Sequence, residues 1–165
     1  MSREWKNLDP ELKTVIMEHQ IEAPVKVSSV AKALGLIVRA STLPAGISGE
    51  IRPDPDRPGN YIIRVNRHDS APRQRFTVAH EIGHYLLHKD QIARGIQDDA
   101  LYRSTLSDQR EAEANRMAAD ILMPADLVED AIARARILGV EDVTPYLAAQ
   151  FEVSEAAMKI RLGLA

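Results

Sequence analysis

The run RFTVAHEIGHYLLH at residues 75–88 constrains the fold of this chain more than any other feature of its sequence. Apolar side chains recur nearly all round a helix drawn through it, which is typical of a helix enclosed by other elements. The same run holds three of the five histidines of the 165-residue chain. Buried imidazoles and a buried glutamate need polar partners. The fold, or a metal ion, has to provide these partners.

Two histidines of this run have the spacing of metal ligands. His80 and His84 are four residues apart, so on a helix they share one face, about 6 Å apart along the axis. With Glu81 they form the motif H-E-x-x-H, in which the histidines bind zinc and the glutamate is the general base towards a zinc-activated water. The alternative is an ordinary core helix with hydrogen-bonded histidines. The motif and its helical setting favour the metal site.

A third ligand has to come from elsewhere, because a catalytic zinc usually has three protein ligands and one open position. The chain has no cysteine, and Leu87 and Asp90 stand where HExxHxxGxxH would have a glycine and a histidine. The stretch QREAEAN at 109–115 offers two glutamates. Glu111 lies in helical phase with small alanines that allow close packing, and we predict it as the third ligand. The alternative for Glu111 is a solvated helix glutamate.

Other residues of this second helix have weaker assignments. Its polar face carries Glu113, Arg116 and Asp120, and we expect that face to meet solvent. Asn115, one turn after Glu111, is placed to hydrogen-bond a ligand histidine. A site of two histidines and one glutamate suits Zn²⁺, although Mn, Co or Fe could also bind there.

Three more residues are candidates for the site. His88 either ends its helix near the terminal carbonyls, which we favour, or reaches the cleft. Tyr102, in a long loop, either packs or offers its hydroxyl to a developing oxyanion. Arg75 either positions substrate or pairs with an acid.

The order of predicted elements indicates an α+β protein with a small N-terminal sheet packed on the HExxH helix and a helical C-terminal half. We expect one metallopeptidase domain, with an N-terminal helix extension at 1–24, a catalytic core at 25–124 and C-terminal helices at 125–165. Capping residues and periodicity predict a first helix that starts at 9–10, a long helix from 69 or 70 to 88, and further helices at 29–34, 107–122, 124–138, 145–151 and 154–162. They also predict strands at 36–41, 47–52 and 61–66, the last two joined as a hairpin by a turn-rich loop at 53–60. Residues 90–106 show no clean periodicity and are predicted to form a loop at a functional edge.

Composition excludes several other classes of protein. Without cysteine there is no thiol nucleophile, thiolate metal site or disulfide framework. A net charge of −3 gives no general attraction to nucleic acid or to an anionic membrane. The charged N-terminal stretch does not read as a signal peptide, and no apolar run approaches the length of a membrane span. We therefore expect a cytoplasmic protein.

Two motifs together resemble the ImmA/IrrE family of zinc-dependent metallopeptidases. They are RFTxAHExGHxxLH at 75–88 and ExEANxxAxxxLMP at 111–124. The resemblance implies a gluzincin-like fold, zinc on His80, His84 and Glu111, and Glu81 as the base. It also implies a substrate, since members of the family cleave or inactivate helix-turn-helix repressors in stress responses or mobile-element regulation. One departure is Met117, where the family usually has phenylalanine. We expect no fused helix-turn-helix domain, so the target would be another protein.

Two other functions compete with this hypothesis. Residues 147–162 have the two-helix outline of a helix-turn-helix, but the second helix offers only Lys159 and Arg161 as basic groups, too few for phosphate contacts. The other alternative keeps the metal site but binds a repressor without cutting it. We therefore predict a metallopeptidase with a protein substrate.

Overall fold

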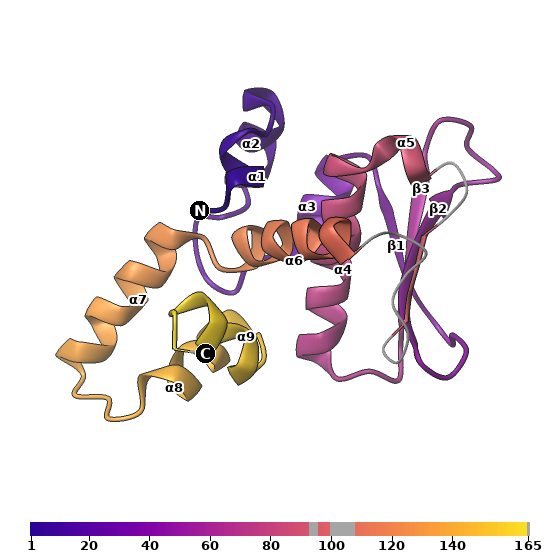
Figure 1. Ribbon diagram of the computed structural model, residues 1–165. Helices are drawn as coiled ribbons and strands as arrows, with labels where there is room; N and C mark the ends of the chain where they lie inside the picture. Colours follow the sequence, from indigo (N-terminus) through magenta and orange to yellow (C-terminus); the bar gives the residue numbers. More distant parts are fainter. Residues whose placement is uncertain (93–95, 100–107, 165) are drawn as a thin grey trace.

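The computed structural model describes residues 1–92, 96–99 and 108–164, with the backbone alone at 96–99. A four-stranded sheet lies on one side of α4, and α6 crosses α4 and leads away to the C-terminal helices (Figure 1). The elements in chain order are α1 Arg3–Lys6, α2 Pro10–Met17, α3 Val27–Ala33, β1 Ile37–Ser41, β2 Ile47–Pro53, β3 Tyr61–Asn66, α4 Ala71–Leu87, α5 Lys89–Ile92, β4 Ile96–Asp99, α6 Asp108–Leu122, α7 Ala125–Ile137, α8 Val143–Phe151 and α9 Glu155–Arg161. The predicted α+β class is confirmed.

The sheet has the strand order β1-β3-β2-β4. β2 and β3 form the predicted antiparallel hairpin, β1 pairs in parallel with β3, and β4 pairs antiparallel with β2. Ile63 in the centre of β3 is fully buried and pairs with Val38 on one side and Ile51 on the other. A β-branched, apolar centre suits a strand that is covered by neighbours. The hairpin therefore presents β2 and β3 to α4.

α4 is the central helix of the core. The hydroxyl of Ser70 accepts a hydrogen bond from the backbone N–H of Arg73, and a proline stands in the first turn, so the predicted start is confirmed. Every residue from Thr77 to His84 is buried. A Cβ added at Gly83 would lie 3.0 Å from the carbonyl oxygen of Ala114. Because Ala114 belongs to α6, α4 and α6 approach so closely that a side chain at residue 83 would push α6 away.

A second close approach joins α4 to the sheet. A Cβ built on Gly49 in β2 would lie 2.4 Å from Cγ2 of Thr77 and 3.0 Å from the carbonyl oxygen of Arg64. The same position is 3.7 Å from Oε1 of Glu81. The missing side chain at residue 49 therefore sets how near the sheet comes to Glu81.

Replacing Gly49 by alanine is expected to destabilise the protein by about 1–3 kcal/mol, the usual range for overpacking a core. Denaturant unfolding measures the change. Adding Thr77→Ser removes the nearer of the two clashing groups, so the double variant should regain part of the lost stability. A double variant as unstable as the sum of the two single variants would contradict this packing.

The prediction that the polar face of α6 meets solvent holds for Arg116, which is exposed, and is wrong for Asp120. Asp120 is fully buried, and its carboxylate accepts hydrogen bonds from Ser2 and from Arg161, the latter at 3.0 Å. Arg116 donates two hydrogen bonds to Glu4, and this bonding holds the pKa of the Glu4 carboxyl at about 2. The N-terminal residues and α9 cover the Asp120 end of the face that periodicity assigned to water.

Three elements were not predicted. α1 is a single turn capped by Ser2, too short for a periodic signal. α5 overlaps the predicted loop at 90–106 and β4 lies inside it, so that prediction is wrong for the residues described there. β4 has the sequence IQDD and pairs through its backbone with β2. A search of the described helices finds none with the length and apolarity of a membrane span.

Candidate metal centre

Three side chains from α4 and α6 converge at the centre of the molecule. His80 Nε2 is 3.1 Å from Glu111 Oε2, and His84 Nε2 is 3.4 Å from Glu111 Oε1. One ligand atom of each residue lies within 4.8 Å of the others. His80 and His84 lie on one face of α4 because they are one turn apart, and Gly83 lets α6 bring Glu111 close enough to face them.

These residues fit a metal ion by the chemistry of their donors. Two neutral imidazoles and one carboxylate are the set that zinc takes in catalytic sites with an open position. Both imidazoles are buried, whereas the side chain of Glu111 is 17% exposed.

Glu81 is fully buried one residue after His80. Its carboxylate lies toward β2, with Oε1 near the backbone of Gly49. It is not a member of the His80–His84–Glu111 group. This position, beside the candidate ligands but outside their cluster, is compatible with a general base.

The other nitrogen of each histidine has its own partner. His80 Nδ1 is 2.8 Å from Oδ1 of Asn115, the contact that a residue one turn after Glu111 was expected to make. His84 Nδ1 is 2.9 Å from Nδ1 of His88. These contacts leave both Nε2 atoms directed at Glu111.

His88 ends α4, as the favoured interpretation required, but its ring does not serve the terminal carbonyls. Its Nε2 is 2.8 Å from Oε2 of Glu113. This hydrogen bond lowers the pKa of the Glu113 carboxyl. Glu113 was assigned to solvent, so it is a residue that sequence reasoning missed. Helical phase separates Glu113 from Glu111, and nothing in the sequence shows that α4 ends beside it.

Two further candidates lie away from these ligands. Arg75 donates to the carbonyl oxygens of Val25, Phe151 and Glu152 and pairs with the Glu152 carboxylate at 3.6 Å. It therefore pairs with an acid and ties α4 to the turn between α8 and α9. Tyr102 lies outside the described residues.

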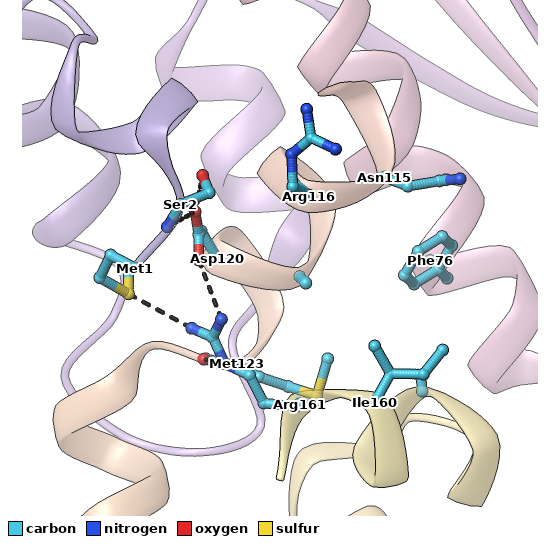
Figure 2. A pocket seen from close by; sticks show the side chains of 11 residues that line it. Met1, Ser2, Phe76, Asn115, Arg116, Asp120, Met123, Ile160 and Arg161 are labelled. Carbon is cyan, nitrogen blue, oxygen red and sulfur yellow. Dashed lines mark hydrogen bonds and ion pairs between the residues drawn. The ribbon is translucent and has the colours of Figure 1, made fainter. Parts of the chain in front are cut away.

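A pocket of about 490 Å³ lies between the N-terminal residues, α4, α6 and α9 (Figure 2). Its apolar walls include Phe76, Met123 and Ile160. The charges of Asp120 and Arg161 at its edge are paired with each other. Asn115 lines this pocket and also contacts His80, so the pocket adjoins the metal centre without containing the three candidate ligands.

The C-terminal helix pair lacks the charge that DNA binding needs. Arg161 donates to the carbonyl oxygen of Met123 and to Asp120, and its side chain is 17% exposed. Lys159 is then the one basic side chain of α9 that remains exposed. The structure thus favours the interpretation that α8 and α9 close the core.

Comparisons with known proteins identify relatives of this chain. The family model described as the IrrE N-terminal-like domain, Peptidase_M78, matches residues 31–163. The chain is 38% identical over 77 residues to the radiation response metalloprotease IrrE of Deinococcus deserti, covering 47% of this chain and 27% of that protein. It is 26% identical over 86 residues to the metallopeptidase ImmA of Bacillus subtilis, covering 52% of this chain and 48% of ImmA. The chain thus spans less than half the length of these relatives.

One solved structure shows the same fold. A transcriptional regulator of Mycobacterium tuberculosis superposes with a TM-score of 0.54 at 16% sequence identity, covering 94% of this chain and 47% of that one. At this identity the likeness concerns the fold alone.

Proposed function

We propose a function for this chain from the family to which it belongs, that of the IrrE N-terminal-like domains, and from its own site: it is a metal-dependent endopeptidase with a zincin-like catalytic domain. The observation that carries the proposal is the convergence of His80, His84 and Glu111 within 4.8 Å, with Glu81 buried beside them. A protein substrate follows from relatives that are named metalloprotease and metallopeptidase.

His80, His84 and Glu111 would hold the metal ion, for which the donor set favours Zn²⁺ over Mn, Co or Fe. When bound, such an ion lowers the pKa of a water and polarises the substrate carbonyl. Asn115 and His88 orient the two imidazoles so that their Nε2 atoms face Glu111. The chain itself thus supplies a preorganised site that needs little rearrangement to bind the ion.

Glu81 would carry the proton of the reaction. Its carboxylate takes a proton from the attacking water as the oxygen bonds to the peptide carbonyl carbon. The same carboxyl then gives that proton to the nitrogen of the leaving amine as the carbon–nitrogen bond breaks. Burial against β2 keeps Glu81 away from bulk water, which would otherwise compete for the proton.

For the substrate we propose a helix-turn-helix repressor or an antitoxin-like partner, cut in the cytoplasm during a stress response or mobile-element regulation. The resemblance of the two motifs to the ImmA/IrrE family supports this choice. With Arg161 paired, α9 has one exposed basic side chain, Lys159, which supports a protein target rather than DNA.

The test is to incubate the zinc-loaded protein with any helix-turn-helix repressor that is encoded beside its gene. We expect two fragments that mass spectrometry assigns to one cleavage site, no cleavage in 1,10-phenanthroline, and recovery when zinc is restored. An unrelated folded protein is the control and should stay intact. A repressor that is bound and inhibited but never cut, with or without chelator, would overturn the peptidase in favour of a binding protein.

A further inference from the structure

A line of hydrogen bonds runs from the metal centre to α6 through buried groups. His84 Nδ1 is 2.9 Å from His88 Nδ1, and His88 Nε2 is 2.8 Å from Glu113 Oε2. His84 and His88 are 0% and 3% exposed, and the Glu113 side chain is 18% exposed. Gln109 donates to the other oxygen of Glu113 at 3.1 Å. The carboxylate is therefore held in place by two donors.

The chemistry of the end group decides which atoms carry protons. A carboxylate only accepts hydrogen bonds, so the Nε2 of His88 must be the donor to Glu113. A neutral His88 then has a lone pair on Nδ1, which can only accept from the Nδ1–H of His84. His84 with its proton on Nδ1 has its lone pair on Nε2, the atom that faces Glu111.

We infer that His88 and Glu113 are positioning residues, which set the tautomer and the ring orientation of His84 so that its Nε2 is ready to bind the metal ion. This inference rests on the proposed metal site and deepens it. It assigns work to Glu113, which lies two residues from the proposed ligand Glu111 and does not touch the ion.

The two proposed histidine ligands are held by different kinds of acceptor. His80 Nδ1 meets the neutral amide oxygen of Asn115, whereas the His84 line ends at a charged carboxylate. An anionic end group makes the imidazole a stronger donor to a metal. We expect the metal binding of His84 to depend on His88 and Glu113 more strongly than that of His80 depends on Asn115.

The experiment measures metal affinity and geometry rather than activity. Zn²⁺ affinity is obtained by competition with a coloured chelator, and the visible spectrum of the Co²⁺-loaded protein reports the ligand geometry. The variants are His88→Phe and Glu113→Leu, which remove the line, and Glu113→Gln, which keeps a neutral acceptor for His88. Glu129→Leu, at an exposed glutamate of α7, is the matched control.

We expect His88→Phe and Glu113→Leu to weaken Zn²⁺ binding by about 10–100-fold, as loss of an outer partner typically does, and to change the Co²⁺ spectrum. Glu113→Gln should recover much of the affinity, and Glu129→Leu should bind like the wild type. Unchanged affinity and spectrum in His88→Phe and Glu113→Leu would overturn the inference and leave the metal site standing. A wild-type protein that binds no metal would overturn both.

A second measurement does not depend on whether the variants fold. Long-range ¹H–¹⁵N NMR of the wild-type protein, in chelator at neutral pH, identifies the tautomer of each histidine. We expect His88 protonated on Nε2 and His84 protonated on Nδ1. His84 with its proton on Nε2 would overturn the inference directly.

Discussion

Replacing Glu81 by glutamine is expected to lower peptide cleavage by about 10²–10⁴-fold, the usual contribution of a general acid–base residue, while the metal content stays at about one ion per chain. Glutamine has nearly the same shape as glutamate, so it fits the fully buried position beside β2. Its amide cannot take a proton from water or return one to the leaving amine. The substitution therefore removes the proposed chemistry and leaves the proposed ligands.

The measurement is kcat on the cleaved partner, with zinc content determined on the same samples. Glu129→Gln at the surface of α7 is the matched control and should keep full activity. The thermal midpoint of each variant, measured in chelator, shows whether the fold is intact. Full activity in Glu81→Gln would refute its role as the base. Loss of zinc together with activity would make Glu81 part of the metal site instead.

Removing a proposed ligand should have the second large effect. His80→Ala and Glu111→Gln are expected to lower Zn²⁺ affinity by more than the roughly 10–100-fold expected for an outer partner, because each deletes one of three donors. After dialysis against a weak chelator, the wild type should keep about one zinc ion per chain and the variants almost none. The variants should lose cleavage activity together with the zinc.

Glu113→Gln is the matched control for Glu111→Gln, since the same change is made on the same helix two residues away. It should cost much less affinity. Thermal unfolding gives an independent reading, because an ion that binds only the folded state raises the stability of that state, by about 2.7 kcal/mol at a hundred times its Kd. The wild type should gain stability with zinc and Glu111→Gln should not. Equal gains in both would remove Glu111 from the proposed ligands.

Much of the fold was predictable from local rules. The cap at Ser70 and the proline behind it mark the start of α4, and the turn-rich loop between two β-branched runs marks the β2–β3 hairpin. α1 and β4 were missed for one physical reason. Each is too short to have a period of its own, and each is held by partners distant in sequence, Asp120 for the residue capping α1 and β2 for β4.

The candidate site divides in the same way. The spacing of His80 and His84 is a matter of positions within α4, and the small residues in phase with Glu111 are a matter of positions within α6. Such spacings within a single helix are visible in the sequence. The roles of Glu113 and Asp120 depend on what lies against α6. Periodicity ranks the faces of a helix by polarity, but a polar face can be covered by a buried histidine or an arginine as well as by water.

The sequence by itself determined the helix of residues 75–88, its two paired histidines and the glutamate beside them, because helical geometry relates residues that are near in the chain. It also offered Glu111 as their predicted acidic partner, through its phase with small residues on a second helix. Only the tertiary structure decided that Gly83 admits α6, that Gly49 brings β2 against Glu81, and that His88 links His84 to Glu113. Those contacts join residues far apart in the chain. Their geometry follows from how closely the helices and the sheet can pack.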